Sequence, residues 1–226
     1  MTLTPITNRT TSAFRALLLL TAAALASANA APMITPNGNP TSAAALEPTS
    51  LLVQSFTLAD TWTNVSISAS LITFSSGTGT AYLTNQFGAG TTVANQIGTT
   101  GFVFTPVATL TSAVSVSLFS GLTLAPGTYY LTFATAEPCC NQGISVNPAM
   151  TFTTAGGVSV GSPQNINTGL NALFPPASTG TLSTSTFGNR FFTVTGDLAS
   201  SAVPEPSTVL LISAGLLAMI HLRKRQ

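Results

Sequence analysis

The feature that most constrains the fold of this chain is an alternation of apolar and polar residues with a period of two. In the segment WTNVSISASL, residues 62–71, serine and asparagine alternate with an apolar set made of Val65, Ile67, Ala69 and Leu71. Segments 114–118 and 129–134 repeat the pattern, and segments 52–58, 80–83, 102–105, 150–153 and 191–195 are further strand candidates. Successive side chains of a strand point to opposite faces, so the pattern predicts β-strands with one buried face.

Glycine, proline and asparagine interrupt these segments at short intervals, and no stretch from 51 to 196 has the helical period of 3.6. Together these observations predict an antiparallel, jelly-roll-like β-sandwich over residues 51–200, in an all-β protein. Pro126-Gly127 predicts a turn between Leu124 and Tyr129. The preceding segment, 31–50, is rich in proline, serine and threonine and is predicted to be a linker.

Charge is scarce, because only 5% of the residues are charged against about 25% in ordinary domains. Residues 31–203 hold four carboxylates and one cation, Arg190, which gives a formal charge of −3. Nucleic-acid binding is excluded, because neutralising phosphates needs several lysines or arginines. Serine, threonine, asparagine and glutamine must keep the domain soluble, and such a surface hydrogen-bonds to water and to sugars.

The domain lacks the residues of common catalytic sites. A Ser-His-Asp set needs a base, but the only histidine is His221, near the C-terminus, and residues 31–203 contain no lysine. A glycosidase needs two carboxylates about 5–10 Å apart, for which Asp60 and Glu137 are the alternative candidates. No D-x-[DN]-x-[DN]-G calcium loop is present. We therefore expect no catalytic residues, no metal, no cofactor and no enzymatic activity.

Trp62 is the one tryptophan of the chain. It could stack on a sugar, which would make the domain a carbohydrate-binding module for exopolysaccharide. A tryptophan at the head of an alternating strand is also typical of a core or sheet-edge position.

Cys139 and Cys140 are adjacent in EPCCNQG. In an oxidising compartment they could form a vicinal disulfide, bridge two chains, or remain free thiols. A vicinal bridge needs a distorted turn, because consecutive Cα atoms lie about 3.8 Å apart. Pro138 and Gly143 suit such a turn.

The N-terminus has the pattern of a secretory signal peptide over residues 1–30. Arg9 and Arg15 precede the apolar run ALLLLTAAALA, and small residues Ala28 and Ala30 define a cleavage site before Ala31. The predicted partners are therefore the Sec export machinery and signal peptidase.

The C-terminus, residues 201–226, has three parts in order. The motif Val203-Pro204-Glu205-Pro206 comes first, an apolar run over 207–222 is predicted to be a transmembrane helix, and the basic residues Arg223, Lys224 and Arg225 follow. The run is short for a bilayer, which takes about 20 apolar residues. The basic cluster acts as a stop-transfer signal and would keep the preceding domain outside.

These three parts resemble the PEP-CTERM sorting signal. The resemblance implies an exported protein of a Gram-negative bacterium that also makes extracellular polysaccharide. It also implies a partner, the exosortase transpeptidase, which removes the tail. The chain would be anchored transiently in the membrane and then reach the cell surface or the medium. The middle region, about 54–196, resembles the choice-of-anchor β domains that accompany such tails, on the segments WTNVSISASL, GTAYLTNQFGAG and LFSGLTLAPGTYYLTF; that family implies a β-sandwich and no established activity.

Overall fold

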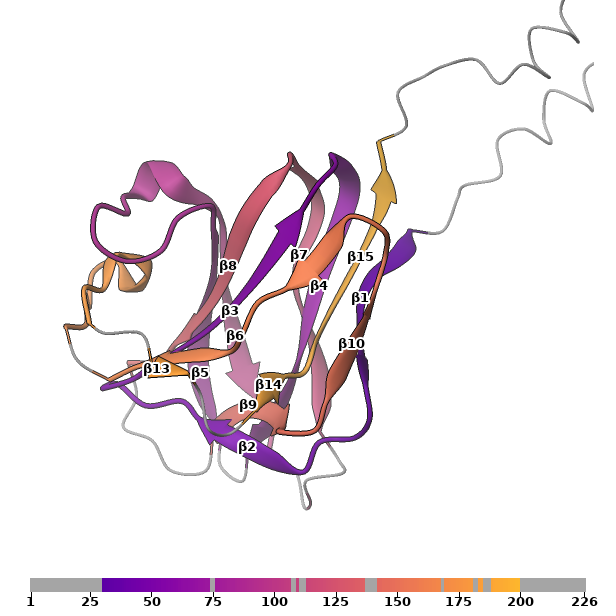
Figure 1. The fold of residues 1–226 in the computed structure, drawn as a ribbon. Helices are drawn as coiled ribbons and strands as arrows, with labels where there is room; N and C mark the ends of the chain where they lie inside the picture. The colour runs from indigo at the N-terminus through magenta and orange to yellow at the C-terminus, as the bar shows by residue number, and fades with distance from the viewer. Residues whose placement is uncertain are drawn as a thin grey trace, which may run out of the picture.

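The computed structural model describes residues 30–73, 76–106, 109, 113–136, 142–167, 169–180, 183–184 and 188–199. In this part the chain forms two antiparallel sheets packed face to face (Figure 1), which confirms the predicted all-β sandwich. The predicted signal helix and the predicted C-terminal transmembrane helix lie outside the described residues. Within them, no helix has the length and apolar character needed to cross a membrane.

The first sheet runs in the order β10 (Thr151–Thr154), β1 (Ala31–Asn37), β15 (Phe192–Leu198), β4 (Trp62–Thr73), β9 (Gln142–Asn147) and β14 (Asn189–Arg190). Two further strands join it: β2 (Ser42–Ala45) pairs with β9, and β7 (Val114–Leu124) pairs with β4. The strand that carries the clearest alternation, β4, therefore lies inside the sheet, between β15 and β7.

The second sheet runs in the order β13 (Ser183–Thr184), β12 (Gln164–Ile166), β3 (Leu51–Leu58), β8 (Gly127–Ala134), β5 (Gly77–Thr84) and β6 (Gln96–Phe104). β11 (Val158–Val160) also pairs with β3. Two short 3-10 helices, η1 (Val93–Asn95) and η3 (Pro175–Ala177), lie in the loops beside this sheet (Figure 1).

The main core lies between the two sheets. The apolar residues of β4 identified from the alternation, Val65 to Leu71, are all buried there, together with Phe56, Phe133 and Phe192 from neighbouring strands. The rings of Phe56 and Phe192 lie 6.2 Å apart across this layer. In β7 the simple alternation fails: the β4–β7 register shifts repeatedly, so that adjacent Leu118 and Phe119 are both buried while Val114 is 38% exposed.

The turn predicted at Pro126-Gly127 is present, and it carries the chain from one sheet to the other. β7 belongs to the first sheet and β8 to the second, so the turn is a corner of the sandwich. The Tyr129 hydroxyl donates a hydrogen bond to the backbone oxygen of Ala125 at 2.6 Å, across the corner. The Tyr129 ring stacks on Phe56 at 5.5 Å, which ties the corner to the core.

The linker prediction for residues 31–50 is wrong, because this segment supplies β1 and β2 of the first sheet. Met33 and Ile34 are fully buried in the core. Proline favours a linker because it cannot donate a ladder hydrogen bond. Here each half of β1 has a partner strand on one side only, and each half contains one proline. Pro32 pairs with β15 and Pro36 with β10.

β1 also brings the two ends of the domain together. Ala31 lies opposite Gly196 and Pro32 opposite Thr195, so the predicted mature N-terminus starts beside the last strand of the sandwich. Figure 1 shows β1 beginning and β15 ending at the same corner of the molecule. The chain thus enters and leaves the domain at one point.

Arg190, the one cation of residues 31–203, is fully buried. It lies in β14 of the first sheet, and its guanidinium donates hydrogen bonds to the Gln164 backbone oxygen, at 3.4 Å, and to Oδ1 of Asn165, both in β12 of the second sheet. Burial lowers the pKa of Arg190 to about 10, which leaves the group charged at neutral pH. The guanidinium is therefore a polar bridge between the two sheets.

Deleting residues 31–37 from the exported protein should abolish cooperative folding. The deletion removes the strand that joins β10 to β15 and withdraws Met33 and Ile34, each worth about 1.5–3 kcal/mol of burial, from a domain whose total stability is of order 5–15 kcal/mol. Circular dichroism during thermal unfolding tests this. The control is the chain that begins at Ala31; equal melting of the two chains would contradict the assigned role of β1.

Arg190→Lys should lower the free energy of unfolding by about 2 kcal/mol, because one ammonium cannot replace the planar fork that reaches three acceptors, the backbone oxygens of Gly188 and Gln164 and Oδ1 of Asn165. Denaturant titration measures the change. In a double-mutant cycle with Asn165→Leu, Arg190→Met should show a coupling of about 1 kcal/mol or more. Strict additivity of the two changes would show that the bridge contributes nothing.

Candidate functional site

The outer face of the second sheet is covered, which the alternation did not predict. Leu51, Val53, Ala134 and Ile166 form a second buried cluster on this face, with Tyr82 and Tyr130 packed against it. Thr132, which lies on the face of β8 opposite to that of Leu131 and Phe133, is also fully buried. The second sheet thus has apolar layers on both sides.

Two loops build this cover. The loop after β5 contains η1, and the segment 169–180 contains η3; the Gly88 amide joins them by donating a hydrogen bond to the Pro176 carbonyl at 2.8 Å. The Phe174 ring meets the Tyr82 ring edge-on at 6.0 Å. Oδ1 of Asn171 accepts hydrogen bonds from the amides of Leu173 and Phe174, at 3.1 and 3.0 Å, which fixes the turn before η3.

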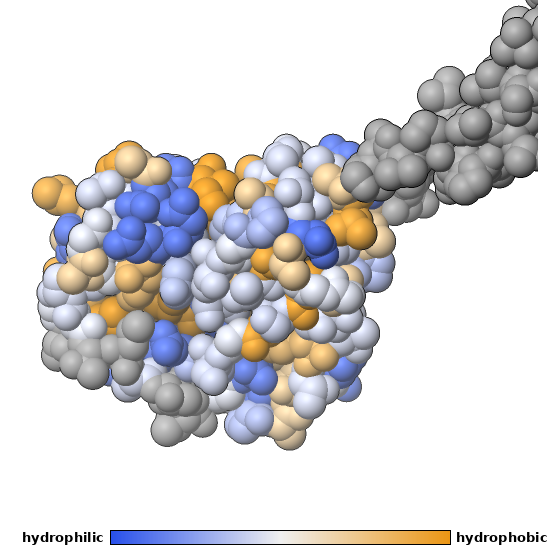
Figure 2. All heavy atoms as spheres, turned by 45° about the horizontal axis from the view of Figure 1, so that its top comes forward, coloured by the Kyte–Doolittle hydropathy of each residue, from blue (hydrophilic) through white to orange (hydrophobic). Residues whose placement is uncertain are grey.

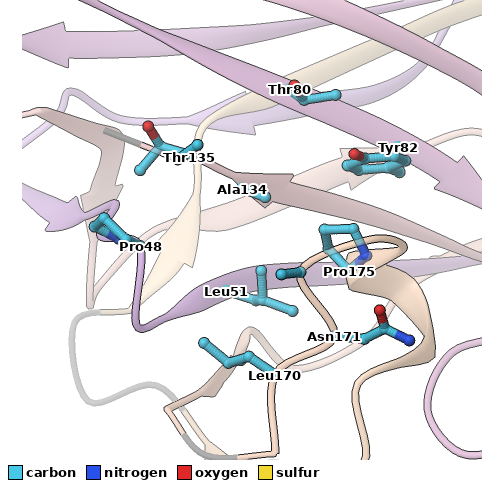
Figure 3. Close-up of a pocket in the computed structure, with 11 residues that line it drawn as sticks. Pro48, Leu51, Thr80, Tyr82, Ala134, Thr135, Leu170, Asn171 and Pro175 are labelled. Atoms are coloured by element: carbon cyan, nitrogen blue, oxygen red, sulfur yellow. The ribbon is translucent and has the colours of Figure 1, made fainter. Parts of the chain in front are cut away.

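A pocket of about 340 Å³ opens between the sheet and the segment 169–177. Figure 3 shows Thr80, Tyr82 and Thr135 along one side of it and Leu51, Leu170 and Pro175 along the other, with Ala134 between the two sides. The lining is completed by Pro48, Ala136, Asn171 and Ala172. None of these residues is charged, and the pocket has one hydroxyl-bearing wall and one apolar wall.

The position of the pocket follows from the strand directions. Leu51 begins β3 and Ala134 ends β8, so the pocket lies at the end of the sheet where β3 starts. The chain leaves the domain at the other end, since Leu198 of β15 pairs with Trp62, just after β3 has ended. The eight residues of β3 separate these ends by about 25 Å.

The point where the chain leaves the sandwich is held by close backbone packing. Asn64 has a positive φ of 51°, and its side-chain Nδ2 donates a hydrogen bond to Oδ2 of Asp197 at 2.8 Å. A Cβ at Gly196 would lie 2.8 Å from Sδ of Met33, so a larger residue at this position of β15 would require the Met33 side chain to shift. The Ala199 amide still bonds to the Thr61 carbonyl, at 2.9 Å, so ordered pairing extends to residue 199.

Trp62, the predicted sugar contact, is buried with 4% of its surface exposed, so it cannot serve as a stacking platform. Its side chain packs in the main core. The indole nitrogen has no hydrogen-bond partner among the described residues. Trp62 lies at the start of β4 on the face that points into the core. This is the core position that the sequence analysis gave as the alternative to a sugar contact.

The other predicted site residues lie mostly outside the described part of the chain. This applies to Ala28 of the signal cleavage site, to Cys139 and Cys140, to the motif Val203, Pro204, Glu205 and Pro206, and to Arg223, Lys224 and Arg225. Ala30, which precedes the predicted cleavage, is described and half-exposed next to the start of β1. These assignments stay predictions from the sequence.

Glu47 lies apart from the other two described carboxylates. Glu47 lies before the start of β3, whereas Asp60 and Asp197 lie at the end where the chain leaves the domain. The length of β3, about 25 Å, therefore separates Glu47 from Asp60, far beyond the spacing of about 5–10 Å that a glycosidase pair needs. Glu137 is not among the described residues. In the part of the chain that the structure describes, no group of three or more His, Cys, Asp or Glu residues could hold a metal ion.

The outer surface has the neutral character that the composition indicates. Figure 2 shows a face on which pale residues of intermediate hydropathy predominate, with scattered hydrophilic and hydrophobic patches. A hydroxyl pair also joins two neighbouring strands: the side-chain oxygens of Thr57 in β3 and Thr128 in β8 lie 3.0 Å apart. This exposed contact is a neutral hydrogen bond and not an ion pair.

Comparison with known proteins assigns the C-terminal segment. The family model of the PEP-CTERM protein-sorting motif matches residues 202–226. The chain carries a PEP-CTERM sorting motif. The match begins three residues after Ala199, the last described residue, and it is the signature of an exported protein directed to an exosortase. No curated protein and no solved structure matches the chain, so the resemblance of its middle region to choice-of-anchor domains stays a prediction.

The hydroxyl of Tyr82 is neutral at physiological pH, since burial raises its pKa above the ordinary value of 10. Burial also raises the pKa of Tyr129, partly offset by the hydrogen bond to Ala125. Both shifts stabilise the fold fully below pH 10, and this stabilisation is lost as the pH rises through the folded-state pKa.

Between pH 9 and 11 the parent should consequently lose more unfolding free energy than the double variant Tyr82→Phe, Tyr129→Phe. Urea titrations across that range measure the difference. The lowered pKa of Arg190 changes the stability in the opposite direction, but it does so equally in both proteins, so its contribution cancels in the comparison. Parallel stability curves for the two proteins would contradict the buried state of these hydroxyls.

Proposed function

We propose that this protein is a non-enzymatic component of the cell surface or extracellular matrix, delivered by an exosortase-like transpeptidase that acts at the motif of residues 203–206. The observation that carries the proposal is the sorting motif over 202–226, placed directly after the last strand of the sandwich. The C-terminal run would hold the exported domain in the membrane until the tail is removed.

The fold supports this order of events. β15 pairs with both β1 and β4, so the first sheet cannot close until the chain up to residue 198 has been exported. Glu205 follows Ala199 by six residues, a reach of roughly 20 Å at most. The transpeptidase would therefore work close to the folded sandwich, beside the end that carries Asp60 and Asp197.

The chemistry of the domain supports a role without catalysis. Residues 31–203 contain neither histidine nor lysine. The Asp197 carboxylate accepts a hydrogen bond from the side-chain Nδ2 of Asn64. Glu47 lies at the opposite end of β3 from Asp60. A neutral surface rich in hydroxyl groups suits a protein embedded in hydrated polysaccharide, because its hydrogen bonds are little affected by salt.

Glu205→Gln should block removal of the tail while leaving the membrane anchor intact. The change preserves the backbone restrictions of Pro204 and Pro206 but removes the one negative charge of the motif, which a basic pocket of the transpeptidase would recognise. Mass spectrometry of the C-terminus, together with fractionation into membrane and medium, should show a full-length, membrane-bound form.

Asp197→Asn is the matched control. It removes a carboxylate eight residues upstream, within the fold, and should be processed like the parent. The sorting role of Glu205 is wrong if Glu205→Gln and the parent give the same mature mass and the same distribution.

A further inference from the structure

We infer that the pocket between β5, β8 and the segment 169–177 binds one unit of an uncharged sugar. The inference rests on the proposed function only in taking the ligand to be extracellular. The site is distinct from the sorting motif and from Trp62, which is buried.

The two walls of the pocket match the two kinds of surface on a sugar ring. Leu51, Leu170 and Pro175 offer an apolar wall for the C–H face of the ring. The facing wall carries the hydroxyls of Thr80, Tyr82 and Thr135. A ligand without hydroxyl groups would leave this wall unsatisfied once water is displaced, which costs binding energy.

The hydroxyl groups have hydrogen-bonding capacity to spare. Those of Thr80 and Tyr82 have no partner among the described residues, and each can donate one bond and accept two. The Thr135 hydroxyl is already engaged, because it donates to the Thr78 carbonyl at 2.9 Å. Thr80 and Tyr82 thus offer both donors and acceptors to one ligand, as a polyhydroxylated molecule requires.

The absence of charge sets the class of sugar. None of the described residues that line the pocket is charged, and the one cation of residues 31–203, Arg190, is not among them. Glu47, the neighbour of Pro48 in the chain, lines a separate pocket, and burying an anionic ligand without a counter-charge is costly. The pocket therefore favours neutral hexoses over uronic acids. Its volume, about 340 Å³, lies at the low end of the range for small-molecule sites, about 300–1,000 Å³.

The apolar wall is held in place before any ligand binds. Asn171 fixes its turn through two backbone amides, and the Asn171 amide itself donates to Oγ of Ser178 at 2.9 Å. A preformed wall reduces the ordering cost of binding. The pocket also lies at the end of the sheet away from the chain exit, so it remains accessible while the protein is tethered at its C-terminus.

Saturation-transfer NMR and calorimetry on the purified exported protein test the inference, with cellobiose, maltose and lactose as neutral probes and glucuronic acid as the acidic one. We expect at least one neutral disaccharide to bind and glucuronic acid to bind more weakly. Thr80→Val and Tyr82→Phe each remove one hydroxyl while keeping the shape of the side chain. Each should weaken binding about three- to tenfold, the effect of one neutral hydrogen bond.

Tyr130→Phe is the matched control, because Tyr130 lies on the same outer face, packed against Phe87 at 5.9 Å, but does not line the pocket. It should leave the affinity unchanged, and thermal unfolding of every variant verifies that the fold is intact. The inference is overturned if no neutral disaccharide binds, or if Thr80→Val and Tyr82→Phe leave the affinity for the disaccharide unchanged. It is also overturned if octanol binds in the pocket and the sugars do not. None of these results depends on C-terminal processing, so failure of the sorting proposal would be recognised separately.

Discussion

The pairing of the first strand with the last is the contact on which the rest of the structure depends. β1 divides its pairing between β15 and β10, and Ile34, where the two halves meet, pairs with both neighbours and is fully buried. This pairing closes the first sheet, brings the two chain ends to one corner, and seats Met33 in the core. In the proposed function, it would also determine which end of the sandwich faces the membrane before the tail is removed.

The second constraint is the near absence of charge. The single cation lies inside the domain, and loops cover a sheet face that charged side chains would otherwise keep soluble. The one cation of the domain is used inside, as a bridge from β14 to β12, where its attraction to neutral oxygens is not weakened by water. The outer face of the second sheet is covered by loops rather than by ionic side chains. Because those loops do not seal the face completely, a neutral pocket remains at their margin.

The strands that could be predicted were those with one buried face. β4 followed its alternation, because one side packs in the core and the other carries serines. Prediction failed where the local pattern did not reflect the tertiary contacts. Pro32 and Pro36 made β1 unrecognisable as a strand, since proline is tolerated only where a strand pairs on one side. Thr132 and Ala134 lie on the outer face of β8, and their burial depends on loops that are distant in sequence. The sorting motif was recognisable because it is a linear signal, whereas the pocket joins residues from 48 to 175 that only the fold brings together.

The sorting signal follows one end of the sandwich, and the pocket lies at the other. In the proposed function, the tail is removed close to the membrane, so the β1–β15 corner would lie near the membrane surface. The proposed sugar site lies at the opposite end of the sandwich, about 25 Å away along β3. Tyr82 and Thr80 belong to β5, which pairs with β8 well away from the β1–β15 corner, so contacts at the pocket and processing at the tail need not disturb one another. In the proposed function, the length of one strand would separate the end that the transpeptidase approaches from the end that holds the pocket.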